Sequence, residues 1–262
     1  MSDQVETSEQ FVDVPGGKVF VRCWTPSQVR NQTPVVLLHD SLGCVEMWRD
    51  FPQKLSEKTG RVIFAYDRLG FGRSSPRTEL PSVRFVSEEA EIYLPAVLKA
   101  LNLDKFALFG HSVGGAMAVI AAGTIGKNCT QIITESAQAF VEDRTRAGIT
   151  QAKSDFADPK IYAKLEKYHG EKTRWVLSAW IDVWLSEGFA NWSLQEDLLK
   201  VKCPALVIHG DKDEYGSVKF PEMIAGLAGG PSEKHVISGC GHVPHREMPD
   251  LILSLVTDFL KT

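Results

Sequence analysis

The stretch LFGHSVGGAMAVIAA, residues 108–122, sets one serine between glycines and follows it with small apolar residues. The residues before that serine include KFALF (105–109), a compact apolar run typical of a buried strand. Residues 113–122 are small or apolar nearly all round, which indicates a buried helix. A strand, the segment Gly110-His111-Ser112-Val113-Gly114 and a helix therefore follow one another without a break.

This order is the context that the G-x-S-x-G elbow requires. The serine takes a strained conformation that points its hydroxyl off the sheet, and side chains at Gly110 and Gly114 would collide across the tight turn. The helix begins directly behind Ser112, so its free N–H groups and positive dipole end face an oxyanion formed there. The alternative is a serine that only stabilises a turn by hydrogen bonds. The flanking elements favour the catalytic elbow.

The bulk properties of the chain exclude several classes of protein. Its 262 residues suffice for one large domain or a domain with an insertion. A net charge of -4 gives no sign of a nucleic-acid partner. The sequence has neither an apolar run of bilayer length nor the pattern of a signal peptide in residues 1–10. Five scattered cysteines without C-x-x-C spacing favour a reduced, cytoplasmic location. Nothing distinguishes a monomer from a homodimer.

Strand-like and helix-like segments alternate along most of the chain. Two apolar segments around VPGG (14–17) predict a hairpin. Residue 95 is a proline within a helical segment, so we expect a kink there. The alternation predicts an α/β fold with a mostly parallel sheet, helices on both faces and a ligand site at the carboxyl ends of the strands. The expected strands are 34–40, 61–67, 105–109, 131–137, 204–210 and 234–239, and the expected helices include 48–59, 84–101, 113–122 and a last helix around 252–259.

One stretch breaks the alternation, because residues 138–202 look helical throughout. Val176, Trp180 and Trp184 form one stripe at helical spacing, and a second apolar stripe lies beside it. Both stripes could pack in a core. The interpretation we favour is a helical cap over 138–202, with tryptophans on its inner wall, inserted into a core domain formed by residues 1–137 and 203–262.

A serine nucleophile needs a histidine to take its proton and a carboxylate to orient that histidine. In this architecture the acid follows a late strand and the histidine follows the last one. HGDKDEYGS (209–217) offers Asp213, with Asp211 and Glu214 as alternatives. ISGCGHVPHREMPD (237–250) offers His242 in a tight glycine-rich loop. His245 is the alternative, and we expect it at a helix entry or on the surface.

Two further donors are expected to hold an oxyanion. One is the backbone N–H of Val113, and the other is that of Ser41 in HDSLG (39–43), unless that segment is only a turn. The spacing of the histidines does not match that of a metalloprotease, so neither a metal nor a cofactor is expected. The remaining histidines are interpreted as structural (39, 111 and 209) or as surface residues (169 and 235).

Together these motifs resemble the α/β-hydrolase superfamily. The segments LLHDSLG, YDRLGFGRSS, FGHSVGG, HGDKD and GCGHVPHRE follow the order typical of that superfamily over nearly the whole chain. The HDSLG loop is similar to the N-S-L-G loop of 3-oxoadipate enol-lactonases. The segment ESAQAFVEDRTRAGITQAK (135–153), the cap helices and VKCPALVIHGDKD are similar to the valacyclovir-hydrolase-like branch, which cleaves esters of α-amino acids. The resemblance implies Ser112 as nucleophile, Asp213 as acid and His242 as base.

The chain departs from these relatives at two positions. Asp40 stands where the first loop usually has glycine, and Val113 stands where the valacyclovir-hydrolase branch has an acidic residue. An ammonium-bearing substrate is therefore not supported at Val113, although Glu135 or Asp40 could supply a charge. The residues expected around the substrate are His39, Asp40, Leu42, Glu135, Trp180 and Trp184.

These observations predict a cofactor-free serine hydrolase, an esterase for small or medium carboxylic esters. The alternatives are a lactone or carbon–carbon bond hydrolase, or a cofactor-free lyase, that uses the same triad. A further alternative is a ligand receptor built on the same fold.

Overall fold

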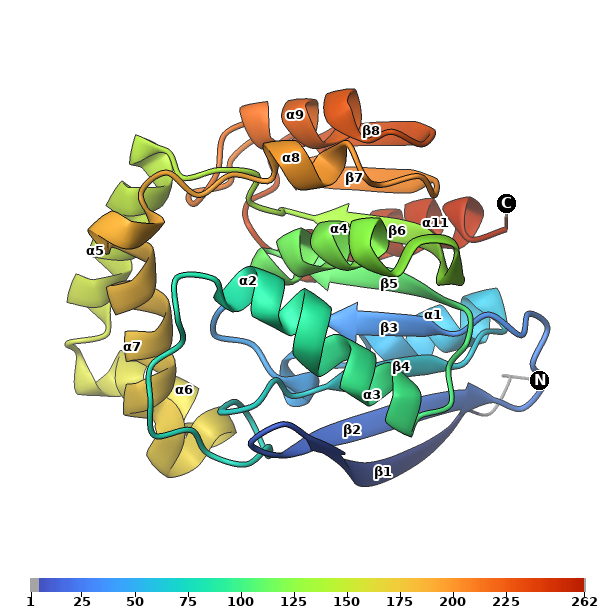
Figure 1. Ribbon diagram of the computed structural model, residues 1–262, viewed down its shortest axis with the longest axis horizontal. Helices are drawn as coiled ribbons and strands as arrows, with labels where there is room; N and C mark the ends of the chain where they lie inside the picture. Colours follow the sequence, from blue (N-terminus) through green and yellow to red (C-terminus); the bar gives the residue numbers. More distant parts are fainter. Residues whose placement is uncertain (1–4, 262) are drawn as a thin grey trace.

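The computed structural model describes residues 5–261, which form an eight-stranded sheet in the order β1-β2-β4-β3-β5-β6-β7-β8 (Figure 1). β2 pairs antiparallel with β1 and with β4, and every other neighbouring pair is parallel. The predicted α/β fold with a mostly parallel sheet is therefore confirmed. The strands are β1 (Val5–Val14), β2 (Gly17–Pro26), β3 (Val35–Leu38), β4 (Ile63–Tyr66), β5 (Phe106–His111), β6 (Cys129–Glu135), β7 (Ala205–Gly210) and β8 (Ser232–Ile237).

The predicted hairpin joins β1 and β2. Val14 pairs with Gly17, so that Pro15 and Gly16 form a two-residue turn. Gly16 has a φ of 87°, a left-handed conformation in which glycine carries no Cβ penalty.

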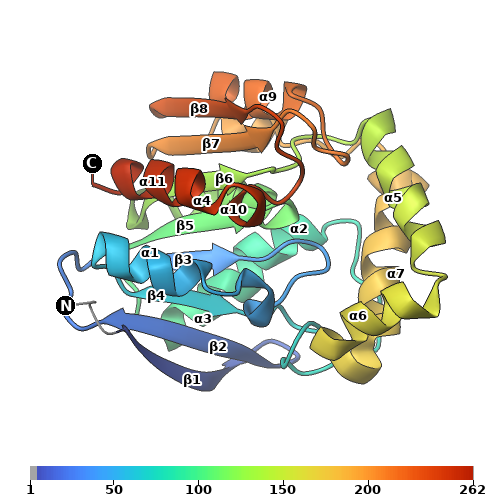
Figure 2. The ribbon, with the colours of Figure 1, turned by 180° about the vertical axis from the view of Figure 1, so that it is seen from behind.

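Helices cover both faces of the sheet, as the alternating pattern predicts. Residues 113–122 of α4 are all buried, which explains why this helix carries only small or apolar side chains there. On one face lie α2 (Phe85–Glu88), α3 (Leu94–Ala100), α4 (Val113–Ile125), α8 (Gln195–Leu198) and α9 (Lys219–Leu227) (Figure 1). On the other lie α1 (Phe51–Thr59), α10 (Pro244–Glu247) and α11 (Pro249–Phe259), seen in Figure 2.

The kink expected between residues 84 and 101 takes the form of a π-helical turn, η2 (Glu89–Tyr93), between α2 and α3. Pro95 directly follows this π-helical turn in a continuous helical segment, where its missing N–H interrupts the regular hydrogen-bond pattern. π-helical turns are rare and frequently lie at functional sites.

The helices α5 (Asp143–Asp155), α6 (Pro159–His169) and α7 (Thr173–Trp184) stand beyond the carboxyl ends of the parallel strands (Figures 1 and 2). They cover the edge where the sequence predicts the ligand site. The next helix, α8, packs instead against α4 and α9 on a face of the sheet. None of the helices within residues 5–261 is long and apolar enough to cross a bilayer.

Candidate active site

Ser112 lies at a sharp turn between β5 and α4. Its φ of 57° and ψ of -127° are strained for a residue with a side chain. A Cβ on Gly110 would lie 2.1 Å from the carbonyl oxygen of Gly114, and a Cβ on Gly114 would lie 2.1 Å from that of Leu38. The two glycines are therefore required by close backbone contacts, as the sequence predicts.

Three side chains from three distant segments meet at this turn. The Oγ of Ser112 lies 3.0 Å from Nε2 of His242. Nδ1 of the same imidazole lies 2.9 Å from each carboxylate oxygen of Asp213. All three residues are buried. The arrangement lets Ser112 donate its proton to His242 while Asp213 accepts the hydrogen bond from the other ring nitrogen.

The environment keeps the Asp213 carboxyl ionised. Burial alone would raise its pKa, but attraction by His242 and their hydrogen bond outweigh burial, so the pKa lies below its usual value. The backbone N–H of Tyr215 also donates to Asp213 Oδ1 at 2.8 Å. The two alternative acids take no part in these contacts: Asp211 accepts a hydrogen bond from the Gly239 N–H, and Glu214 lies on the cavity wall.

The loop after β3 lies beside the elbow. Asp40 Oδ1 accepts the backbone N–H of Leu42 at 2.7 Å, which organises the loop as a tight turn. The N–H of Ser41 has no hydrogen-bond partner among residues 5–261. The N–H of Val113 belongs to the first turn of α4, where N–H groups have no partner within the helix. Both expected oxyanion donors are thus free to bind an oxygen.

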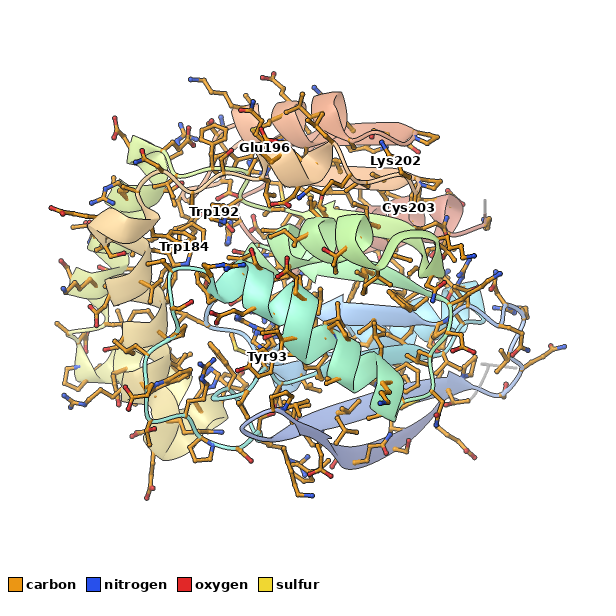
Figure 3. All side chains as sticks on the ribbon, viewed as in Figure 1. Tyr93, Trp184, Trp192, Glu196, Lys202 and Cys203 are labelled. Carbon is orange, nitrogen blue, oxygen red and sulfur yellow. The ribbon has the colours of Figure 1, made fainter. Side chains whose placement is uncertain are left out.

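A cavity of about 250 Å³ opens onto Ser112 and His242. Its walls are mainly apolar, and Trp180 and Trp184 of α7 form part of them. Figure 3 shows Trp184 where the cap meets the core. Of the residues expected around a substrate, Asp40, Leu42, Trp180 and Trp184 line this cavity, whereas His39 and Glu135 do not.

Sequence reasoning missed two residues of the site, Gln138 and Tyr215. Gln138 Nε2 lies 3.2 Å from Ser112 Oγ, and its side chain is buried. The Tyr215 ring meets the His242 ring edge to face, with centroids 4.8 Å apart. Gln138 follows the carboxyl end of β6 by three residues and Tyr215 follows Asp213 by two. Both residues could have been predicted from the sequence, because each closely follows the end of a strand and the strands of a parallel sheet end at the same edge.

His169 was expected on the surface but is buried, so that prediction was wrong. His169 of α6 lies 2.8 Å from the Leu42 carbonyl oxygen through Nε2, and its Nδ1 accepts the Gly72 N–H at 2.9 Å. It therefore ties the cap to two core loops. His245 begins a helix as expected but is buried, because its ring pairs with Glu135.

Glu135 thus contacts His245 and does not line the cavity. The ligand atoms of His111, Glu135 and His245 lie within 4.8 Å of one another. Hydrogen bonds already engage these groups: Glu135 accepts from His245, and His111 Nε2 lies 2.8 Å from the His242 carbonyl oxygen. These contacts account for the cluster as a structural network. Of the remaining histidines, His39 and His209 are buried and His235 is partly exposed on the edge strand β8.

Comparison with known proteins supports the same family assignment. Human serine hydrolase BPHL, a valacyclovir hydrolase, is 27% identical over 246 residues, covering 87% of this chain and 79% of that protein. Mouse 1-acylglycerol-3-phosphate O-acyltransferase ABHD5 is 37% identical over 106 residues, which is 37% of this chain but only 28% of that protein. The structure of an enol-lactonase from Burkholderia xenovorans LB400 superposes with a TM-score of 0.74 at 18% identity, covering 97% of this chain and all of that one.

The valacyclovir-hydrolase branch is thus represented among the sequence relatives, and the enol-lactonase shares the fold. The family described as the alpha/beta hydrolase family matches residues 35–255, a span that holds the elbow, the acid and the histidine. The order of the strands in this protein, the position of the cap helices and the contacts at Ser112 agree with this match. The chain belongs to the alpha/beta hydrolase family.

Proposed function

We propose that this protein is a serine hydrolase that cleaves carboxylic esters of small to medium size through an acyl-enzyme. The observation that carries the proposal is the continuous chain of hydrogen bonds from Ser112 through His242 to Asp213 at the wall of a cavity. A serine hydroxyl is a poor nucleophile without a neighbouring base. These hydrogen bonds place such a base, His242, next to Ser112.

In the first half of the reaction, Ser112 Oγ attacks the ester carbonyl carbon while His242 Nε2 takes the hydroxyl proton. The carbonyl oxygen becomes an oxyanion, which the N–H groups of Ser41 and Val113 are positioned to bind. Removing one such donor typically costs about 3–4 kcal/mol of barrier. The imidazolium then gives its proton to the leaving alkoxide oxygen, and the carbon–oxygen bond breaks.

In the second half, His242 takes a proton from water, and the resulting nucleophile attacks the acyl carbon. The tetrahedral intermediate collapses, the carboxylic acid leaves, and Ser112 regains its proton from His242. Asp213 remains ionised throughout and stabilises the imidazolium. The amide of Gln138, which contacts Ser112 Oγ, can orient the serine hydroxyl before it attacks the substrate.

The cavity supports the proposed size of substrate. Its volume of about 250 Å³ is near the small end of the range for small-molecule sites, and its walls are mostly apolar. The part of the acyl group that lies in this cavity is therefore expected to be compact and apolar, with the cap side chains Trp180 and Trp184 limiting its length. We propose that residues 138–202 are an insertion between core segments 1–137 and 203–262, and that α5, α6 and α7 of this insertion form the cap that shapes the cavity.

The test combines covalent labelling with turnover. Wild-type protein and Ser112→Ala are treated with a fluorophosphonate and weighed as intact proteins, and hydrolysis of p-nitrophenyl acetate, butyrate and octanoate is measured in parallel. A single adduct that the variant lacks, together with turnover, is the expected result. An adduct without ester turnover contradicts the ester assignment and favours a lactone, a carbon–carbon substrate or a receptor ligand. An unchanged adduct on Ser112→Ala contradicts the nucleophile.

A further inference from the structure

Arg68 is a buried cation in direct contact with no carboxylate of the described residues, and the charge that most favours its ionised form is the Glu89 carboxylate. It follows β4 in the loop at 67–75, and only 5% of its surface is exposed. Its Nη2 donates to the Asp40 carbonyl oxygen at 2.7 Å, and its guanidinium carbon lies 4.3 Å from the centre of the Phe71 ring. Its Nε has no hydrogen-bond partner, and within residues 5–261 Arg68 makes no ion pair. A desolvated guanidinium in this state is unfavourable unless a further group satisfies it.

Arg68 faces a narrow cavity of about 20 Å³ that adjoins the catalytic cavity. The two cavities share three wall residues, Ser41, Trp180 and Trp184. The two cavities are therefore neighbours, and a substrate bound at Ser112 would have to pass Ser41, between the cap and the core, to reach the guanidinium. The volume holds one or two oxygen-sized atoms, which suits the end of a substituent rather than a ring.

The opposite wall is built from the π-helical turn that interrupts the helices before α4. Glu89 and Tyr93, both from η2, line this narrow cavity. Tyr66 donates a hydrogen bond to Glu89 Oε1 at 2.5 Å, and burial raises the pKa of the Glu89 carboxyl. A group bound between Arg68 and Glu89 therefore meets a strong donor on one side and a carboxyl that protonates more readily than usual on the other.

The other charged groups on this wall are less suited to a ligand. Arg77 stands near the Tyr93 ring, with 5.8 Å from its guanidinium carbon to the ring centre. Glu88 accepts a hydrogen bond from Ser82 Oγ at 2.6 Å on an exposed part of the chain. Arg246 lines the catalytic cavity directly, but its Nη2 donates to the Met47 carbonyl oxygen and its residue is partly exposed. Among these charged residues, Arg68 is therefore the buried hydrogen-bond donor that lines the narrow cavity.

Resting on the proposed hydrolase function, we propose that Arg68 binds a carboxylate at the distal end of the acyl group, so that the preferred substrates are half-esters of dicarboxylic acids. A carboxylate would accept charge-assisted hydrogen bonds from the guanidinium, and hydrogen bonds of this kind are the strong ones. This specificity is opposite in sign to that for an ammonium-bearing ester.

The test compares matched esters that differ in one charge. The p-nitrophenyl half-esters of adipic and suberic acid are measured against their methyl p-nitrophenyl diesters, in which the distal carboxylate is neutralised. The carbon chains of these two acids are long enough to disfavour intramolecular attack of the carboxylate on the ester, which would otherwise add to the background rate. The wild-type protein is expected to favour the anionic ester at least tenfold in kcat/KM. In Arg68→Met that preference is expected to fall at least tenfold, with Arg68→Lys intermediate.

Glu89→Gln provides a variant with the opposite expected sign. It removes the opposing carboxylate while keeping an acceptor for Tyr66, so the preference for the anionic ester is expected to rise. Opposite shifts in Arg68→Met and Glu89→Gln would not result from a loss of structure. A preference that disappears only in Arg246→Gln would overturn the proposal, because it would place the anion on the other wall.

The subsite and the hydrolase function fail in distinguishable ways. Turnover of the neutral ester without preference for the half-ester overturns the subsite and leaves the function standing. If no ester reacts and no phosphonate adduct forms, the function fails. The subsite is then tested by thermal unfolding of Ser112→Ala with monomethyl adipate and with dimethyl adipate. A rise in Tm with the monoester alone, absent in the double variant with Arg68→Met, supports the subsite, and equal shifts overturn it.

Discussion

Glu135 and His245 form a buried, doubly hydrogen-bonded pair. The carboxylate Oε2 lies 2.6 Å from His245 Nδ1, and Oε1 accepts the His245 backbone N–H at 2.7 Å. The pair joins the carboxyl end of β6 to α10, immediately after the loop that carries His242. His111 Nε2 lies 2.8 Å from the His242 carbonyl oxygen and holds the same loop from the elbow side. The loop that carries His242, the proposed general base, is therefore held by residues other than Ser112 and Asp213.

We expect Glu135→Gln to destabilise the protein by about 3 kcal/mol at pH 7, because it breaks a buried charged contact. Burial opposes ionisation of Glu135, but attraction by His245 prevails, and the pKa lies below the usual value of 4.5. The ionised Glu135 carboxylate therefore stabilises the fold above pH 4.5, and this contribution is lost as the pH falls through the lower folded-state pKa.

Urea unfolding of wild type and Glu135→Gln between pH 3 and 7.5 measures this effect. The difference in unfolding free energy is expected to shrink toward the acid end of that range. Other carboxylates titrate alike in both proteins and cancel in the difference. If the difference in unfolding free energy stays constant with pH, packing and not charge accounts for the lower stability of Glu135→Gln.

Asp213→Asn is expected to lower kcat by roughly 10⁴-fold while leaving the fold intact, because an amide no longer selects the His242 tautomer that accepts from serine. Glu214→Gln is the matched control, since Glu214 lies next to Asp213 but has no contact with His242. Steady-state kinetics on a p-nitrophenyl ester provides the readout. If Glu214→Gln loses more kcat than Asp213→Asn, Asp213 is not the acid of the triad.

Trp180→Ala is expected to shift the acyl-chain preference toward longer esters. The Trp180 ring stands against Tyr215, with centroids 5.7 Å apart, and separates the cavity from the cap interior. Removing it enlarges the cavity and costs about 3–5 kcal/mol of stability. The ratio of octanoate to butyrate kcat/KM should rise in Trp180→Ala and change little in Trp180→Phe. An unchanged ratio in both variants would exclude Trp180 from the acyl site.

Gly114→Ala is expected to disrupt the elbow, because a Cβ there meets the Leu38 carbonyl oxygen at 2.1 Å and backbone cannot give way cheaply. We expect a loss of about 1–3 kcal/mol of stability and of most activity. Gly226→Ala in α9 is the control, since nothing lies within 4 Å of its Cβ position and alanine favours a helix. Thermal unfolding and phosphonate labelling of both variants provide the measurement, and equal effects would contradict the steric argument.

The parts of the site that the sequence predicted are those whose physical cause is local. The elbow is five consecutive residues whose turn requires glycine at two positions, and its flanking strand and helix are visible as apolar runs. The kink at Pro95 was predictable for the same reason, although its π-helical form was not. The mostly parallel sheet likewise follows from alternating strands and helices, whereas the order of its strands was not predicted.

The sequence alone determined the fold class, the elbow and the order of the three residues that meet there. Only the tertiary structure decided which polar residues near the strand ends are occupied elsewhere. His169 and His245 look like surface residues in the sequence, yet each finds hydrogen-bond partners from distant segments and becomes buried. Arg68 and Gln138 carry no pattern of their own. Their roles arise from distances between segments far apart in the chain, and periodicity and spacing do not encode such distances.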